Sequence, residues 1–397
     1  MKTRVKSRGN EIVRAAPSAL AVRSAALVAR GLRDLSRHSN WLIKRVAIGH
    51  SPRLAVSPAG QVAAVTRLRS QGTDGLAIYD LESGALKQML PSLGEAASLP
   101  GTPGALAWSP TGRQLAAAWG SSRSDLHLFE LGGKKLAGTF GSFSNFPHSL
   151  TWSEKGRYFA AASAGGSQAQ LRIWSAARES AGPVVFSERP VGEADASAWS
   201  RWRQPDASDE PAASGSSSGP TAAVTSGTEP DEGAFSGFGC SAFSPDETQL
   251  ACAVEMEGDW TDDAIVLLDV PSLGKRGLWH AQGHITDMAW MRGGRGILFC
   301  AAGQAFRLSP EGAEPESLPF GAELCACHPH LPLCLCFSSW LRNSAKGRLF
   351  LVDLQRLEVF DEHAAEGIAD LCWSADGSKA YAMTTGGLAY IYEPPPL

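Results

Sequence analysis

The chain has 397 residues, 44% of them hydrophobic, with 42 glycines, 24 prolines and a formal net charge of −4. This length suffices for one large domain or two ordinary ones, and the glycine and proline content suits many short strands joined by turns. The sequence has no run of about 18 apolar residues, and arginines interrupt the apolar N-terminal stretch, so we expect neither a transmembrane segment nor a secretory signal.

Residues 1–40 form a basic arm that we expect to be partly helical. Residues 1–45 hold eleven Lys or Arg and two acids, whereas the remainder holds 25 basic and 38 acidic residues. Ser18 is a candidate helix N-cap, and the arginines of residues 18–37 gather on one narrow helical face. The arm therefore docks on the acidic body or stays disordered, contacts an anionic surface such as a membrane or nucleic acid, or serves as an organelle import signal.

One sequence unit recurs seven times after the arm. Each copy has an apolar strand, a turn related to WSPxG, a second apolar strand, and a third strand of alternating polarity after a polar loop; most copies add a weaker fourth strand. The first strands of the copies end at Val56, Trp108, Trp152, Phe243, Trp290, Cys327 and Trp373. Four-stranded units at a spacing of about 40–50 residues predict a β-propeller.

The chain resembles the WD-repeat propeller family over about residues 41–397. The resemblance rests on the WSPxG-type turns, on strand ends such as Tyr79-Asp80, and on Gly-His at 49–50 and 283–284. The family's strand-three tryptophan survives at Trp174, where Ser175 replaces the aspartate, so most of the family's hydrogen-bonded His/Ser/Trp/Asp network is absent. A related seven-bladed family of the periplasmic TolB type remains an alternative.

The predicted fold is therefore all-β: a seven-bladed β-propeller of four-stranded antiparallel blades, with an N-terminal helical arm and a disordered insertion. The last unit lacks a fourth strand, and an orphan segment, Trp41–Ile48, precedes the first unit. We expect Trp41–Ile48 to pair with Leu388–Tyr392, which closes the ring of residues 41–397 and leaves only short, protected edges.

Residues 191–236 are predicted to be a disordered insertion between blades three and four. They are poor in aliphatic residues and rich in Ser, Gly, Pro, Ala and acids, so they cannot bury enough apolar surface to offset the cost of ordering. Within them, Trp199 and Trp202 lie beside two arginines. These tryptophans either anchor in the groove of a partner or have no binding role.

The segment CACHPHLPLCLC, residues 325–336, is the most tempting metal site. Its candidate ligands are Cys325, Cys327, His328, His330, Cys334 and Cys336. Zinc prefers such thiolate and imidazole sets, but CxC on flat strands is not the CxxC knuckle that wraps a metal, and the cysteines align with core positions of another blade. We therefore predict reduced, buried packing thiols and no cofactor, with zinc or a disulfide as the alternative.

Partner binding is expected on the propeller face that carries the loops between strands two and three. These loops share a face with the blade-to-blade connections and with the insertion, and exposed tryptophans flanked by charge are typical of interaction hot spots. The candidate residues are Trp260, Asp259, Trp340, Arg342, Arg67, Arg69, Trp199 and Trp202. The acidic loop Glu255–Asp263 is either solvated or binds a cation or a basic peptide.

No catalytic pattern emerges from the sequence. It contains none of the nucleophile-elbow, phosphate-loop, HExxH or dinucleotide-binding motifs, its acids occur mainly in turns, and no acid/base set recurs at inner blade positions. We therefore predict a non-enzymatic, cytoplasmic protein–protein interaction scaffold of WD-repeat type, with a protein partner and no nucleic-acid partner. The alternatives are a propeller enzyme or small-ligand protein with a central-channel site, and organelle import through the basic arm.

Overall fold

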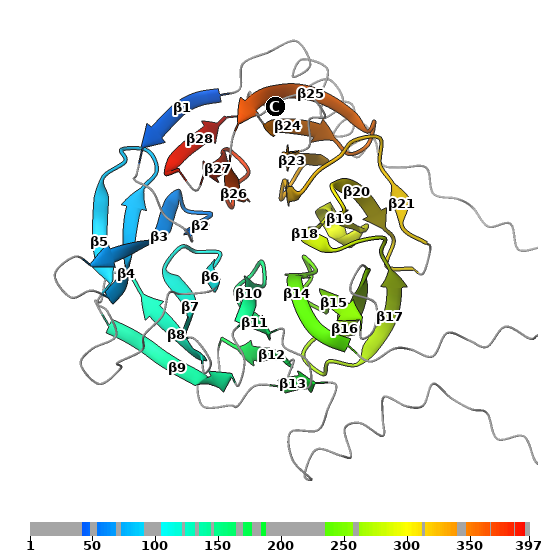
Figure 1. The fold of residues 1–397 in the computed structure, drawn as a ribbon, viewed down its shortest axis with the longest axis horizontal. Coiled ribbons are helices and arrows are strands. Elements are labelled where there is room, and N and C mark those ends of the chain that lie inside the picture. Colours follow the sequence, from blue (N-terminus) through cyan, green and yellow to red (C-terminus); the bar gives the residue numbers. More distant parts are fainter. Residues whose placement is uncertain are drawn as a thin grey trace, which may run out of the picture.

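Seven four-stranded antiparallel sheets form the protein, arranged as blades around a central axis (Figure 1). The structure is a computed structural model. It describes residues 42–47, 54–68, 73–90, 105–120, 124–131, 135–143, 147–163, 170–176, 184–187, 235–256, 262–311, 314–339, 347–365, 367–384 and 386–393. The predicted all-β, seven-bladed propeller is thus confirmed, whereas the predicted helical arm and most of the predicted insertion lie outside the described residues.

The first three blades follow the first three sequence repeats, with strand one innermost and strand four outermost. Blade 1 contains β2 (Leu54–Val56), β3 (Gln61–Leu68), β4 (Thr73–Asp80) and β5 (Leu86–Leu90). Blade 2 contains β6 (Ala105–Trp108), β7 (Gln114–Gly120), β8 (Ser124–Glu130) and β9 (Lys135–Phe143). Blade 3 contains β10 (Pro147–Trp152), β11 (Tyr158–Ser163), β12 (Gln170–Ser175) and β13 (Val184–Ser187).

Blades 4 to 6 repeat the same order of strands. Blade 4 contains β14 (Phe235–Phe243), β15 (Gln249–Met256), β16 (Asp263–Asp269) and β17 (Lys275–His280). Blade 5 contains β18 (Ile285–Trp290), β19 (Ile297–Ala301), β20 (Gln304–Leu308) and β21 (Glu316–Ser317). Blade 6 contains β22 (Leu324–Cys327), β23 (Leu333–Ser338), β24 (Gly347–Asp353) and β25 (Glu358–Ala365).

Blade 7 joins the two ends of the propeller. It contains β26 (Ile368–Trp373), β27 (Ala380–Thr384), β28 (Leu388–Tyr392) and, as its outer strand, β1 (Leu42–Ala47). The register of β1 against β28 runs from Leu42 opposite Tyr392 to Ala47 opposite Leu388. Because a strand from the start of the ring completes the last sheet, the ring is closed by backbone hydrogen bonds.

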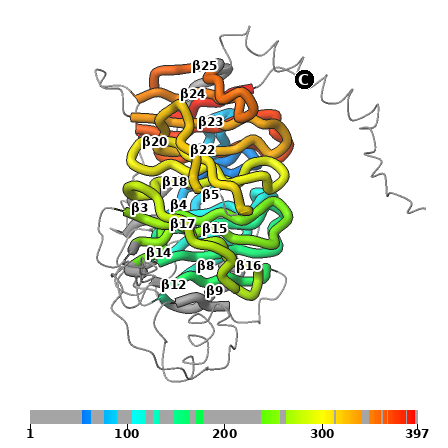
Figure 2. The backbone as a smooth tube through the Cα atoms, turned by 90° about the vertical axis from the view of Figure 1, so that its right-hand side faces the viewer, coloured from blue at the N-terminus to red at the C-terminus, as the bar shows by residue number. Residues whose placement is uncertain are grey.

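The antiparallel order gives the ring two different faces, which lie at opposite ends of the strands when the ring is seen edge-on in Figure 2. We call one the turn face; it carries the tight turns between strands one and two, such as 57–60 and 109–113, and those between strands three and four. We call the other the loop face; there the second strands end and the third strands begin, as at Met256 and Asp263 in blade 4 and at Ser338 and Gly347 in blade 6.

The hydrophobic core is divided into seven parts, one for each interface between consecutive blades, which we call seams. For example, one cluster joins Ile78 of blade 1 to Phe129 of blade 2, and another joins Phe238 of blade 4 to Ile173 of blade 3. Successive side chains of a strand point to opposite sides of its sheet, so each blade supplies alternate residues to the two seams beside it. Every blade therefore depends on both of its neighbours.

Tryptophan side chains also link neighbouring blades through hydrogen bonds. At the end of four of the first strands, the indole Nε1 donates to a carbonyl oxygen of the preceding blade. The pairs are Trp108 to Ala55 (2.9 Å), Trp152 to Ala107 (3.3 Å), Trp290 to Ala242 (2.8 Å) and Trp373 to Ala326 (2.8 Å). A buried indole needs such a partner, which explains the recurrence of Trp in the repeats.

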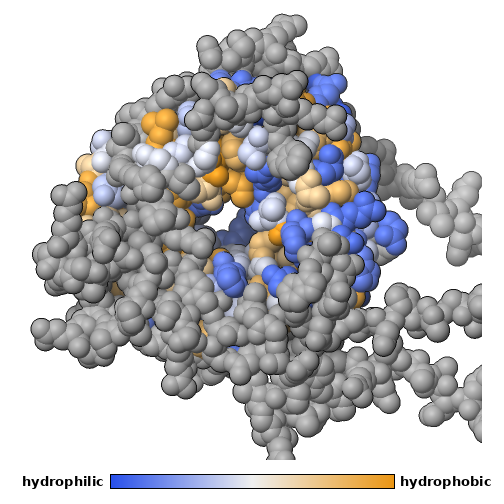
Figure 3. Space-filling view, viewed as in Figure 1, coloured by the Kyte–Doolittle hydropathy of each residue, from blue (hydrophilic) through white to orange (hydrophobic). Residues whose placement is uncertain are grey.

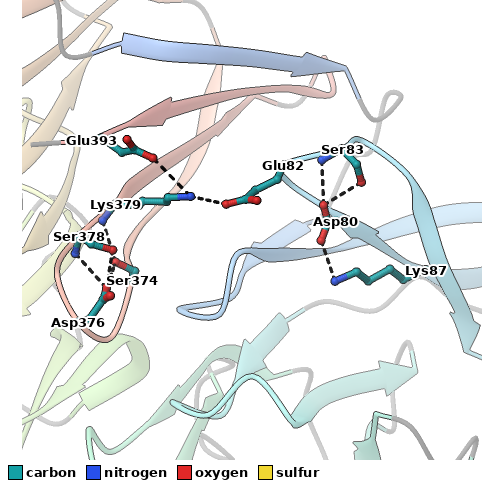
Figure 4. Close-up of polar contacts among 9 residues, drawn as sticks. All are labelled: Asp80, Glu82, Ser83, Lys87, Ser374, Asp376, Ser378, Lys379 and Glu393. Carbon is teal, nitrogen blue, oxygen red and sulfur yellow. Dashed lines mark hydrogen bonds and ion pairs between the residues drawn. The ribbon is translucent and has the colours of Figure 1, made fainter.

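The serine of the WSPxG-type turn closes the turn through its side chain. The Oγ atoms of Ser109, Ser153, Ser244 and Ser374 each accept a hydrogen bond from the backbone N–H five residues on, at 2.8–3.0 Å; Figure 4 shows the bond from Lys379 to Ser374. Among the described residues, the helical segment is a single 3-10 turn, Arg292–Gly294, and no helix is long and apolar enough to cross a membrane.

Candidate functional site

The seven inner strands surround a central cavity of about 540 Å³ to which every blade contributes. It is visible as the opening at the centre of the ring in Figure 3. Most of its lining residues are small, apolar or aromatic, but four charged side chains also line it: Glu154, Asp287, Arg292 and Asp370. A cavity of this size falls in the range of small-ligand pockets.

Asp287 on β18 and Asp370 on β26 use their carboxylates to join blades. Asp287 accepts from the backbone N–H of Cys325 in blade 6 (2.8 Å) and from Met288 (2.9 Å). Asp370 accepts from the backbone N–H of Val56 in blade 1 (2.7 Å) and from Leu371 (2.9 Å). Both oxygens of each carboxylate are therefore engaged by the fold.

The pKa values of both channel acids are raised into the near-neutral range. Burial is the main cause: it raises the pKa of Asp287 to about 7 and that of Asp370 to about 6, against the opposing effect of the backbone hydrogen bonds. The charge of Asp370 adds to the rise for Asp287. Two acids therefore occupy inner-strand positions, one in blade 5 and one in blade 7.

Sequence reasoning missed these two acids although a signal was present. Each stands inside an otherwise apolar first strand, in the patterns TDMAW and ADLCW, three residues before the strand-end tryptophan. An acid at such a position needs a hydrogen-bond partner, because burying an unpaired charge is costly. The partner, a backbone N–H of the next blade, could not be read from the local sequence.

The cysteines of residues 325–336 pack in the core as predicted. Cys327 and Cys334 are directly opposite each other in the β22–β23 hairpin, with their sulfur atoms 3.9 Å apart, and the sulfur atoms of Cys334 and Cys336 are 3.6 Å apart. All the cysteines are free thiols. Burial and the neighbouring thiols raise their pKa values, which keeps them protonated.

His328 turns away from these thiols toward blade 7. Its Nδ1 accepts from the backbone N–H groups of His330 and Leu331, both at 2.9 Å, so its Nε2 donates to the carbonyl oxygen of Gly377 at 3.1 Å. Burial lowers the pKa of His328 to about 4, so the ring is neutral. Within the described residues, no group of three or more His, Cys, Asp or Glu is arranged to hold a metal ion.

The predicted partner-binding residues fall largely outside the described part of the chain. Those that the structure does not describe are Arg69, Trp199, Trp202, Asp259, Trp260, Trp340 and Arg342. Arg67 is described only in its backbone: it belongs to β3, where it is opposite Asp74 of β4, and not to the loop that follows. The partner-binding surface therefore stays a prediction.

The roots of the two tryptophan-containing loops are described, and both are anchored. At the end of the acidic loop, Asp262 accepts from the backbone N–H of Gly283 (2.7 Å), and Asp263 accepts from that of Ile285 (2.7 Å). At the start of the other loop, the hydroxyl of Ser339 donates to the carboxylate of Glu323. Two of the five acids of the segment Glu255–Asp263 thus hold the connection between blades 4 and 5.

These features define a seven-bladed β-propeller with an acid-lined central channel. Solved structures share this architecture. A chain of Kuenenia stuttgartiensis hydrazine synthase superposes with a TM-score of 0.59 at 12% identity, covering 89% of this chain and 97% of that one. A chain of the mitotic checkpoint complex gives a TM-score of 0.58 at 11% identity, with 90% and 97% covered.

The β-propeller domain of Myceliophteria thermophila Cps50 (Swd1) gives a TM-score of 0.55 at 13% identity, covering 89% of this chain and 99% of that domain. No protein-family model and no curated protein matches the sequence. At identities of 11–13% the similarity establishes the fold and leaves function to be argued from the site.

Proposed function

We propose that this protein is a non-enzymatic scaffold that holds a protein partner on its loop face, through the loops containing Trp260 and Trp340. The observation that carries the proposal is the anchoring of both loop roots. Asp262 and Asp263 tie one loop to the connection between blades 4 and 5, and Ser339 ties the other to Glu323 beside blade 6. The two loops therefore leave the ring on either side of blade 5.

Anchored roots favour binding because less conformational freedom is lost when a partner docks. Each loop adds a tryptophan with a charged neighbour, Asp259 in one and Arg342 in the other. Tryptophan and arginine are enriched among the residues that dominate protein–protein binding. Arg67, Arg69, Trp199 and Trp202 extend this proposed surface, and the WD-repeat resemblance of the sequence agrees with a scaffold role.

The channel acids support a structural role for the channel. Asp287 and Asp370 each accept two backbone hydrogen bonds and join blade 5 to blade 6 and blade 7 to blade 1. Acids used in this way connect neighbouring blades, and this favours a scaffold over a channel enzyme.

The test is affinity capture from native lysate, followed by reconstitution with the identified partner. The full-length protein is compared with a Trp260→Ala, Trp340→Ala double variant and with a Leu86→Ala, Met89→Ala control on the outer strand β5, where these side chains are 52% and 38% exposed. We expect the loop variant to weaken binding of the purified partner at least about tenfold, since hot-spot truncations cost about 2 kcal/mol or more. Unchanged binding by that variant would refute the assignment of the face.

A second candidate is a channel that binds or transforms a small ligand. The cavity of about 540 Å³ and the near-neutral pKa values of Asp287 and Asp370 favour it, because acids poised near the working pH are common in active sites. Mass spectrometry of small molecules released from the purified ring, with the Asp287→Asn, Asp370→Asn variant beside it, checks this. A ligand retained by the native protein and lost from the variant would favour the channel.

A further inference from the structure

Cys327 and Cys334 face each other near the turn of the β22–β23 hairpin in blade 6. They are directly opposite in the register of the two strands, and their Sγ atoms are 3.9 Å apart. The neighbouring pair toward the turn is joined by a backbone hydrogen bond of 2.8 Å from the N–H of His328 to the carbonyl oxygen of Leu333. Hydrogen-bonded and non-hydrogen-bonded pairs alternate along an antiparallel ladder, so Cys327 and Cys334 form a non-hydrogen-bonded pair.

The free edge of β22 gives the same assignment independently. The backbone N–H of Cys325 donates to the carboxylate of Asp287 in blade 5 at 2.8 Å, so it points away from β23. Backbone groups two residues apart in a strand point the same way, so the N–H of Cys327 also points away from Cys334. Two separate hydrogen bonds therefore place this cysteine pair at a non-hydrogen-bonded position.

This position suits a disulfide across the two strands. In a non-hydrogen-bonded pair the Cα atoms are about 4.5 Å apart and the side chains are close together. A disulfide spans Cα separations of about 4.4–6.8 Å, with the sulfur atoms about 2 Å apart. Rotation of the two side chains is therefore enough to join Cys327 to Cys334, and the backbone pairing of the hairpin is kept.

The other close thiols of blade 6 are less suited to a disulfide. The Sγ atoms of Cys334 and Cys336 are 3.6 Å apart, but these residues are two apart in one strand, where the Cα separation of about 6.7 Å is near the upper limit for a disulfide. Cys325 is opposite Cys336, but its thiol donates across the seam to the carbonyl oxygen of Leu298 in blade 5, at 3.9 Å. The geometry thus selects Cys327 and Cys334.

The selected pair lies at the wall of the central channel. β22 is the innermost strand of blade 6, and Cys327 is half-buried and belongs to the lining of the central cavity, whereas Cys334 is fully buried. The hydrogen bond with Cys334, together with burial, raises the pKa of Cys327, and burial raises the pKa of Cys334. Both thiols are therefore protonated and react slowly, so their oxidation requires sustained exposure to an oxidant.

We propose that Cys327 and Cys334 are a reversible oxidation site, which a peroxide converts into a cross-strand disulfide. The sulfur of Cys327 attacks one peroxide oxygen and the O–O bond breaks, which leaves a sulfenic acid and releases water. The sulfur of Cys334 then attacks the sulfur of Cys327, and the hydroxyl group leaves as a second water with the proton of Cys334. The two thiols lose two electrons and two protons in total, and hydrogen peroxide is reduced to two waters. A small dithiol reverses the reaction by exchange.

The test is peptide mapping of the full-length protein after treatment with hydrogen peroxide. Free thiols are blocked with N-ethylmaleimide, and the protein is digested with trypsin without reduction. The tryptic peptide 308–342 contains four cysteines: Cys325, Cys327, Cys334 and Cys336. We expect this peptide to lose two of its four labels and to regain them after dithiothreitol. Four labels after a treatment that oxidises the same cysteines in denaturant would overturn the proposal.

Single variants identify the pair. Cys327→Ala and Cys334→Ala should each prevent the disulfide, so that all three remaining thiols of the peptide are labelled. Cys336→Ala is the matched control on the same strand and should keep the disulfide, with one label. Loss of the disulfide in Cys336→Ala would refute the proposed pairing, as would a peptide linked to the separate tryptic peptide that contains Cys300. A structural role alone predicts lower melting temperatures for the variants and no loss of labels from the native protein, and this result would also refute the proposal.

Localisation in the native protein does not depend on the folding of any variant. Pepsin digestion at acidic pH suppresses thiol–disulfide exchange, because thiolates are absent there. Tandem mass spectrometry of the oxidised fragments should place the bond between Cys327 and Cys334. A bond between any other two cysteines would overturn the assignment.

Discussion

The seam between blades 3 and 4 and the seam between blades 1 and 2 solve the same packing problem in different ways. In the first, Tyr158 stacks on Phe243 and the buried carboxylate of Glu247 receives Arg157. In the second, a cavity lies beside Gln61 and Gln88, and each of these glutamines has one buried amide atom without a hydrogen-bond partner in the protein. The seam between blades 1 and 2 is therefore less completely filled at this position than the seam between blades 3 and 4.

Glu247 links the two blades at the seam between blades 3 and 4. It stands where other repeats have a turn glycine, and it adopts the same left-handed backbone, with φ of +63°. Its Oε1 accepts from the backbone N–H of Lys155 at 2.8 Å. Burial alone would raise the pKa of Glu247, but hydrogen bonds from Ser153, Arg157 and Lys155 outweigh it and lower the pKa. The contacts across the seam thus offset an unfavourable local conformation.

The largest loss of stability should come from Phe243→Ala at the seam between blades 3 and 4. The substitution removes the ring on which Tyr158 stacks and leaves a void in the cluster shared with Phe238 and Leu250, so we expect a loss of about 3–4 kcal/mol in the free energy of unfolding. Denaturant unfolding measures it. Leu86→Ala, at a site 52% exposed, is the control and should change stability by less than about 0.5 kcal/mol. Equal losses in both variants would mean that the seams do not carry the stability of the ring.

Glu247→Ala should cost about 2 kcal/mol, because it leaves the backbone N–H of Lys155 without its acceptor and keeps the left-handed backbone. Arg157→Ala should cost less stability than Glu247→Ala, since the arginine side chain is 57% exposed and solvent screens its charge. Thermal or denaturant unfolding of both variants measures the two losses of stability. A larger loss of stability for Arg157→Ala than for Glu247→Ala would contradict the view that Glu247 is the main link between the two blades.

Gln88→Met, at the seam between blades 1 and 2, should not lower the free energy of unfolding. Removing an unpaired buried amide and keeping the side-chain volume should leave stability unchanged or raise it by about 1 kcal/mol. Differential scanning calorimetry of the ligand-free protein checks this, with Gln114→Met beside it. Destabilisation by Gln88→Met of the size expected for Glu247→Ala would show that the two seams are packed alike.

At the two seams bridged by acids, the expected effect is a change in the pH dependence of stability. The pKa values of Asp287 and Asp370 are raised to about 7 and about 6 in the folded protein, above those of an unfolded aspartate. Their contribution is therefore complete below about pH 4 and is lost as the pH rises through 6 to 7. As the pH rises from 5 to 8, the unfolding midpoint should fall more steeply for the native protein than for the Asp287→Asn, Asp370→Asn variant. Parallel curves for the two proteins would contradict the raised pKa values.

The sequence predicted the architecture because the fold repeats its signal seven times. Alternating apolar residues and serine-containing turns recur in each copy, so an error in one copy is corrected by the others. The chemistry of the seams is not repeated. Asp370 bonds Val56, which is 314 residues away, and Glu247 bonds the turn of the preceding blade across 92 residues. Contacts of this kind form between blades and cannot be read from one unit.

The contacts of the histidines near the cysteines also could not be read from one sequence unit. Sequence proximity of His328 and His330 to four thiols suggested a common site, but a turn at the end of a hairpin points away from the strands that carry the thiols. His328 therefore contacts Gly377 of the next blade, where an added Cβ would clash with the imidazole ring. The core position of Cys325 and Cys334, in contrast, followed directly from their alignment with apolar residues.

The pairing of β1 with β28 has a consequence for the order of folding. Blades 1 to 6 are each built from strands close together in the sequence, whereas β1 must find a partner strand more than 300 residues away. Local hairpins form quickly and distant contacts form slowly, because the entropy of closing the intervening chain is lost before the contact is made. We therefore expect the outer strand of blade 7 to dock last, as the step that converts an open row of blades into a ring.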